Sequence, residues 1–124
     1  MTKSQTPPMG TQTTLRVLPK ALVVGRAGAD VEALRLQLGR EGYLMYTAVQ
    51  ADEALKRLRA ERFALVLLDV EVPGMGGAQF VETLRGDSEL ASVPVIVSSA
   101  TDDMDAIERC LERGADDYLP NVFG

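Results

Sequence analysis

The stretch ALVLLDVEVPGMGG, residues 64–77, decides the fold. Its first five residues, 64–68, are all apolar and predict a strand that is buried on both faces of a sheet. The strand runs straight into Asp69, although a buried carboxylate is costly and Asp is a poor strand former. A Pro-Gly turn at Pro73 and Gly74 follows. Two roles are therefore open for Asp69: it caps local structure, or it belongs to a chemical site.

On both sides of this strand, short apolar runs alternate with amphipathic segments. We predict strands at 21–24, 43–47, 64–68, 93–98 and 115–119, and helices from Asp30 to a stop at Gly42 and at 52–61, 79–85 and 103–113. This alternation favours right-handed βαβ units, and so an α/β fold with a single doubly wound, five-stranded parallel sheet. Because the chain stops at Gly124, soon after the fifth strand, we expect the final helix of such a fold to be missing.

The chain divides into a leader and one domain. Residues 1–19 are rich in Thr, Pro, Gln and Ser without periodicity, and we expect a flexible leader. Residues 20–124 form the predicted domain, which we expect to be truncated before its last helix, either at an artificial boundary or before an effector region.

Composition limits the function classes. The 124 residues are 46% hydrophobic and 25% charged, with 18 acidic residues against 13 basic ones and no histidine. This composition is typical of an acidic globular protein, which we expect in the cytoplasm, with neither a nucleic-acid surface nor a membrane segment. The lack of histidine excludes Ser-His and Cys-His catalysis. The single cysteine, Cys110, has helical spacing with its apolar neighbours and is predicted to be a packed core residue.

Ligands of open parallel sheets bind at the carboxyl ends of the strands. Asp69 holds such a position in the prediction. The other predicted strand ends add residues that could share one site with it, namely Gly25, Arg26, Ser98, Ser99, Pro120 and Asn121.

Three segments at consistent spacing resemble the receiver domain of bacterial two-component response regulators: LVLLDVEVPGMGG, VPVIVSSA, and GADDYL with an aromatic following at Phe123. The resemblance covers about residues 20–124. It implies a flavodoxin-like sheet of strand order 2-1-3-4-5. It also implies a non-enzymatic module of phosphorelay signal transduction, whose partner is a sensor histidine kinase or another signalling protein.

Carried over residue by residue, the resemblance implies that Asp69 is the candidate phospho-acceptor. Ser99 stands where the family has a hydroxyl that engages the phosphoryl group, and Tyr118 matches the aromatic residue that moves with it. The main-chain carbonyl of Glu71 matches a magnesium ligand.

The chain departs from the family at two other strand ends. The pair of acidic residues that holds magnesium is replaced by Gly25 and Arg26, and the family's lysine falls on Asn121. Magnesium needs hard oxygen ligands, and Asp69 is the one carboxylate left, so we expect no metal and no other cofactor. A guanidinium from Arg26 about 4 Å from the carboxylate of Asp69 would be attracted by roughly 4 kcal/mol before desolvation, and could hold it in place.

Two interpretations follow from these departures. In the first, the domain is a divergent pseudo-receiver, phosphorylation-independent or weakly phosphorylated, that acts as a protein-interaction module. In the second, Arg26 replaces the metal and Asp69 is still phosphorylated. A C-terminal effector domain and a homodimer are open expectations for either.

Several weaker motifs in the sequence have other possible functions. Gly25 and Gly28 leave a third interpretation, a flavodoxin-like nucleotide-binding domain. The acidic residues Asp102, Asp103 and Asp105 are predicted to cap a helix rather than to bind calcium, and Asp116 and Asp117 are expected to be solvated.

Overall fold

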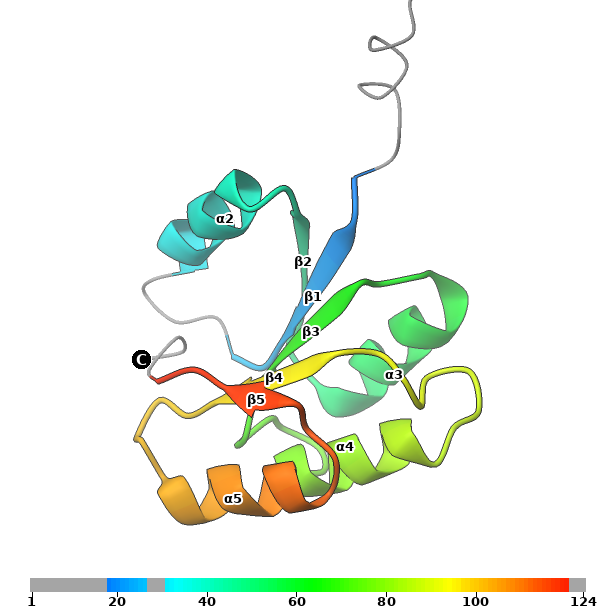
Figure 1. The fold of residues 1–124 in the computed structure, drawn as a ribbon, viewed down its shortest axis with the longest axis vertical. Helices are drawn as coiled ribbons and strands as arrows, with labels where there is room; N and C mark the ends of the chain where they lie inside the picture. Colours follow the sequence, from blue (N-terminus) through cyan, green and yellow to red (C-terminus); the bar gives the residue numbers. More distant parts are fainter. Residues whose placement is uncertain (1–17, 27–30, 121–124) are drawn as a thin grey trace, which may run out of the picture.

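Strands and helices alternate throughout the part of the chain that the computed structural model describes, residues 18–26 and 31–120 (Figure 1). The elements are β1 (Lys20–Val24), α2 (Val31–Arg40), β2 (Leu44–Ala48), α3 (Ala51–Ala60), β3 (Leu65–Asp69), α4 (Gly77–Arg85), β4 (Val95–Ser98), α5 (Met104–Glu112) and β5 (Asp117–Tyr118). The structure confirms every predicted strand and helix within these residues, with ends shifted by at most two positions. The predicted leader falls mostly outside the described residues.

The five strands form one sheet in the order β2-β1-β3-β4-β5, and every neighbouring pair is parallel. This is the order that the resemblance implied. β3 lies at the centre of the sheet, so its apolar run is covered on both faces. All five carboxyl ends consequently lie along one edge, and Asp69 is at the middle of that edge.

The helices divide between the two faces of the sheet. Helix α2 lies on one side, and α3, α4 and α5 lie on the other (Figure 1). Alternate strand residues follow this division: Leu22, Val24, Val66 and Leu68 join the larger core with α3, α4 and α5, whereas Ala21, Val23 and Leu67 pack with Leu38 of α2. Strand side chains alternate between faces, so a continuous apolar run serves two cores.

On the α2 side, a groove remains over the β3–β5 half of the sheet. Its lining includes Leu38, Tyr43, Leu67, Ile96 and Leu119, and Leu119 is 40% exposed. Within the described residues α2 is the one helix on this face. The groove is thus a part of the sheet that no helix of the described residues covers.

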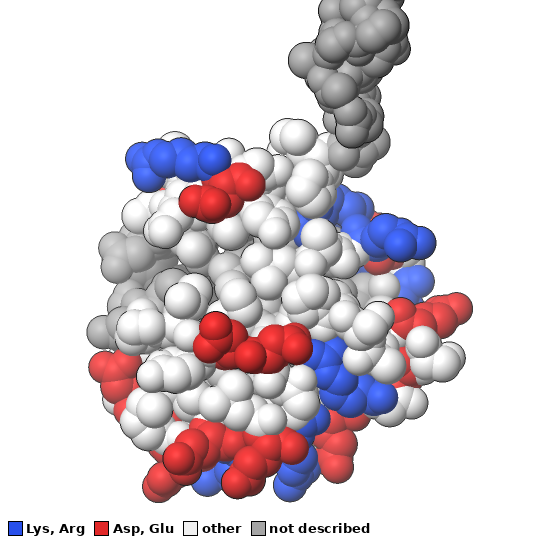
Figure 2. Space-filling model, in the orientation of Figure 1, with Lys and Arg blue, Asp and Glu red and all other residues white. Residues whose placement is uncertain are grey.

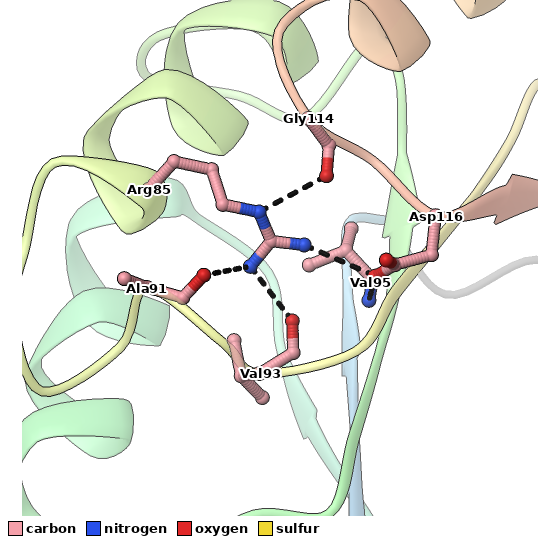
Figure 3. A network of polar contacts seen from close by, with 6 residues as sticks. All are labelled: Arg85, Ala91, Val93, Val95, Gly114 and Asp116. Carbon is pink, nitrogen blue, oxygen red and sulfur yellow. Dashed lines mark hydrogen bonds and ion pairs between the residues drawn. The ribbon is translucent and has the colours of Figure 1, made fainter.

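A partly buried guanidinium joins α4 to the loop before β4 and the loop after α5 (Figure 3). Nε of Arg85 donates to the carbonyl of Gly114 at 3.0 Å, and Nη1 donates to the carbonyls of Ala91 at 3.1 Å and Val93 at 2.8 Å. Its Nη2 pairs with Oδ2 of Asp116 at 3.0 Å. One planar cation thus satisfies three carbonyls from two loops that are far apart in the sequence.

The same network corrects the expectation that Asp116 is merely solvated. Besides pairing with Arg85, its Oδ2 accepts the backbone N–H of Val95 at 2.8 Å, at the first residue of β4. Gly114 must stay a glycine here, because its φ is +119° and a Cβ would lie 2.9 Å from Cγ of Arg85.

Acidic side chains gather at the end of the molecule that α5 occupies (Figure 2). Asp102, Asp103, Asp105, Glu108 and Glu112 are all exposed there. Oδ1 of Asp103 accepts the N–H of Ala106 at 3.1 Å, so Asp103 is the N-cap of α5, as predicted. Among the described helices, none has the length and hydropathy that a bilayer-spanning segment needs.

We predict that Arg85→Lys lowers the free energy of unfolding by about 2 kcal/mol, because an ammonium cannot reach all four partners and leaves loop carbonyls unpaired. The measurement is urea denaturation followed by circular dichroism. Arg113→Lys is the matched control: Arg113 pairs with Glu82 at 2.9 Å, and both side chains are largely exposed. The control should cost less than about 0.5 kcal/mol. Equal costs for the two variants would show that the Arg85 network does not stabilise the fold.

Candidate functional site

Asp69 is the last residue of β3, and its side chain is only 6% exposed. It pairs in register with Ser98 of β4, and the next N–H along the chain, that of Val70, donates to the carbonyl of Ser98 at 2.9 Å. Oδ1 of Asp69 accepts the N–H of Glu71 at 2.9 Å. This bond from residue i+2 closes a local turn at the strand end. Asp69 therefore caps local structure and also lies at the edge where a site is expected.

Gly25 is the nearest neighbour of Asp69 on the β1 side. The β1–β3 register pairs Val24 with Leu68, so the next residues along the two strands lie side by side. A Cβ on Gly25 would lie 2.5 Å from Cβ of Asp69 and 3.2 Å from its Oδ2. The sequence suggested Gly25 as a lost metal ligand or as part of a phosphate loop, and neither prediction includes this contact. Register was the available signal, because it aligns the two residues once β1 and β3 are paired.

Arg26 does not hold Asp69 in the close contact that the sequence suggested. Arg26 is exposed. Among the ion pairs of the described residues, none joins Arg26 to Asp69 within 4.0 Å. The guanidinium nevertheless attracts the carboxylate from a greater distance. The reason is placement: Arg26 follows Gly25 out of the sheet toward solvent, whereas Asp69 is inside its edge.

Burial dominates the electrostatics of Asp69. It raises the pKa of this carboxyl above its ordinary value, while the N–H of Glu71 and, after it, the charge of Arg26 act in the opposite direction. The ionised form thus carries a desolvation cost that its two favourable contacts only partly offset.

Ser99 is fully buried directly after β4, and its hydroxyl is already engaged. Its Oγ accepts the N–H groups of Thr101 and Asp103, both at 3.2 Å, and lies 3.2 Å from Oγ1 of Thr101. The hydroxyl therefore organises the loop that leads into α5. Accepting these two N–H groups uses the oxygen's lone pairs, whereas its O–H can be donated to Oγ1 of Thr101 or to another acceptor.

Two more of the predicted site residues lie along this edge. Tyr118 ends β5 in register with Val97 and is 40% exposed. Glu71 is exposed in the turn after Asp69, where its N–H donates to the carboxylate. Asn121, like Phe123, lies outside the described residues. The structure thus brings together Gly25, Asp69 and Ser98 directly, with Glu71 in the adjoining turn.

The donor set around Asp69 does not fit magnesium. Within residues 18–26 and 31–120, no three His, Cys, Asp or Glu side chains gather in a way that could hold a metal ion. The position next to Asp69 on β1 carries a glycine, and the one after it carries a cation. Magnesium in proteins is held by carboxylates and retained waters, and a nearby guanidinium opposes its binding.

The surroundings of Cys110 and Gly25 argue against a reactive thiol and a nucleotide phosphate site. Cys110 is buried, and burial raises the pKa of its thiol to about 11, so it is the packed core residue that was predicted. The N–H of Gly25 donates to the carbonyl of Ala48 at 2.9 Å and is not free to bind a nucleotide phosphate. Gly28, the other glycine of that motif, lies outside the described residues.

We predict that Asp69→Asn stabilises the domain at neutral pH by about 1 kcal/mol, or about 4 °C in Tm, because it removes a desolvated charge and keeps the oxygen that accepts from Glu71. The folded pKa of Asp69 is raised, so its cost is absent below the unfolded value near 3.8 and appears as the pH rises through the folded value. Thermal melts should therefore show the gain at about pH 7 and a much smaller gain near pH 3. A variant that is less stable than the wild type by the same amount at both values would contradict this account.

Comparisons with known proteins agree with this fold. Residues 22–123 match the family model of the response regulator receiver domain. The transcriptional regulatory protein AfsQ1 of Streptomyces coelicolor is 37% identical over 103 residues, which are 82% of this chain and 44% of that protein. The alkaline phosphatase synthesis transcriptional regulatory protein PhoP of Bacillus subtilis is 35% identical over 84% of this chain and 42% of its own length. The chain thus spans less than half the length of these curated relatives.

Solved structures give the same result. The chemotaxis response regulator CheY4 of Vibrio cholerae superposes with a TM-score of 0.75 at 25% identity, covering 87% of this chain and 90% of that one. The signal receiver domain of a signal transduction histidine kinase from Syntrophus aciditrophicus gives a TM-score of 0.72 at 30% identity, covering 84% and 79% of the two chains. From its strand order, its strand-end aspartate and these matches, the chain belongs to the response regulator receiver domain family of two-component signalling.

Proposed function

We propose that this receiver domain is divergent at its metal site and acts mainly as a protein-interaction module, phosphorylation-independent or weakly phosphorylated. The observation that carries the proposal is the environment of Asp69. A glycine backbone and a more distant arginine stand on the β1 side, where magnesium binding would need carboxylate oxygens.

Phosphoryl transfer depends on positioning and on cations that offset the charge of the transferring oxygens. At the carboxyl end of β1, the cationic side chain among the described residues is that of the exposed Arg26. Oδ1 of Asp69 already accepts a hydrogen bond from the N–H of Glu71. The hydroxyl of Ser99 is committed to its own loop. Each of these contacts favours a resting arrangement over one prepared for a phosphoryl group.

The second candidate is a phospho-acceptor that uses Arg26 in place of the metal. The attraction between Arg26 and Asp69 favours it, because the same guanidinium could turn inward and bind phosphoryl oxygens in a bidentate manner. In that reaction an oxygen of Asp69 would attack the phosphorus of a kinase phosphohistidine, and the P–N bond would break with its electron pair returning to the imidazole.

The partners and setting belong to the same proposal. The domain would contact a sensor histidine kinase or another signalling protein in the cytoplasm, would have no enzymatic activity of its own and would bind neither nucleic acid nor membrane directly. The match covers less than half of each relative named as a transcriptional regulator, so we assign any output to a C-terminal effector domain. A homodimer is compatible with this arrangement.

The test is incubation with acetyl phosphate, or with beryllofluoride, with and without magnesium. We predict that intact mass spectrometry finds no more phosphoryl adduct on the wild type than on Asp69→Asn, and that beryllofluoride leaves the Asp69 NMR signals unshifted whether or not magnesium is present. A magnesium-dependent shift or adduct that Asp69→Asn abolishes would make the domain a working phospho-acceptor switch. An adduct that forms without magnesium and disappears in Arg26→Ala would instead favour the second candidate.

A further inference from the structure

The contact between Gly25 and Asp69 follows from an unusual backbone conformation. Gly25 has φ of +139°, which residues with a side chain rarely adopt. In this conformation the vacant side-chain direction of Gly25 points at the neighbouring strand. A Cβ there would lie 2.5 Å from Cβ, 3.3 Å from Cγ and 3.2 Å from Oδ2 of Asp69.

Rotation of the Asp69 side chain cannot relieve such a contact. The closest atom is Cβ, which keeps its place whatever the χ1 angle, so relief requires a movement of the backbone of one strand. Both backbones are fixed by hydrogen bonds. The N–H of Gly25 donates to Ala48 at 2.9 Å, and around Asp69 the N–H groups of Val70 and Val72 donate to Ser98 at 2.9 Å and to Asp69 at 3.0 Å.

We propose that Gly25 is the positioning residue of this site: its missing side chain lets Asp69 seat against the end of β1, and this seat excludes a side chain at position 25. In this backbone conformation, the space that a side chain at position 25 would take is occupied by Asp69. The inference rests on the proposed function only in taking Asp69 as the central carboxylate of the site, and it holds whether or not Asp69 is phosphorylated.

One consequence concerns the metal. An acid placed at position 25 cannot share the site with Asp69 in its present position, so the lost magnesium ligand is not restored by that single change. Gly25→Asp is expected to lose folded protein, as seen in its thermal melt, and to show no magnesium-dependent shift of Asp69. A folded Gly25→Asp variant whose Asp69 signals respond to magnesium would overturn the proposal.

The central test is a set of alanine substitutions in three backgrounds. Gly25→Ala is made in the wild type, in Asp69→Ala, which keeps the clashing Cβ, and in Asp69→Gly, which removes it. Gly42→Ala is the control, because Gly42 also has a positive φ, of +92°, but a Cβ there meets nothing within 4 Å. Urea denaturation gives the folding equilibrium constant of each variant.

We expect Gly25→Ala to lower the folding equilibrium constant about 10-fold to 100-fold more than Gly42→Ala does in the wild type, the usual range for overpacking. The excess should persist in Asp69→Ala and disappear in Asp69→Gly, while the effect of Gly42→Ala stays the same in all three. If Gly25→Ala does not fold, recovery of folding in the double variant with Asp69→Gly supports the proposal. Failure to fold there as well, or an equal excess in all three backgrounds, overturns it.

A second readout separates positioning from stability alone. In folded Gly25→Ala, we expect the end of β3 to be displaced from β1, which would disturb the hydrogen bonds at that strand end. The N–H of Val70 donates to Ser98 there, and the N–H of Glu71 donates to Oδ1 of Asp69. The amide ¹H–¹⁵N signals of Val70 and Glu71, recorded under native conditions, should therefore shift in Gly25→Ala and not in Gly42→Ala. Unchanged signals would mean that Gly25 does not position Asp69. Neither readout uses phosphorylation, so a positive acetyl phosphate assay would refute the proposed function without touching this inference.

Discussion

The register of two central strands is the constraint from which the site follows. Because Val24 pairs with Leu68, the residues that leave the ladder next, Gly25 and Asp69, are placed side by side at the carboxyl edge of the sheet. Apolar side chains on both faces of β1 and β3 fix that register, because a slip by one residue would move every side chain of the strand to the opposite face of the sheet. The position of a reactive group is thus determined by the packing of the whole domain.

The buried carboxylate of Asp69 has few partners that compensate for its desolvation. Desolvation acts against ionised Asp69, the N–H of Glu71 supports it at short range, and Arg26 supports it from farther away. In a receiver that binds magnesium, the divalent ion would supply most of this compensation. Here the chain supplies it through backbone and a single guanidinium, which is weaker, and the hydroxyl of Ser99 is occupied elsewhere. These contacts are the basis on which we propose partner recognition, rather than phosphoryl chemistry, as the main role of this edge.

Much of the architecture could be predicted from the sequence, because it depends on local patterns. Alternating apolar runs and amphipathic segments located all nine elements, and Asp69 stood out as a carboxylate at the end of a buried strand. The errors have a common cause. The hydrogen bonds of Asp116, the distance of Arg26 from Asp69 and the contact of Gly25 all depend on how loops distant in sequence approach one another. Gly25 illustrates this: the sequence shows the loss of a metal ligand, whereas its φ of +139° brings its backbone against Asp69.

A crystal structure grown with millimolar magnesium and beryllofluoride tests the central claim most directly. Our account predicts that Asp69 remains seated against Gly25, with Oδ1 on the N–H of Glu71 and no metal beside its carboxylate. A hydrated magnesium ion bound to Asp69, with β1 withdrawn from it, would contradict the account and show a conventional receiver site.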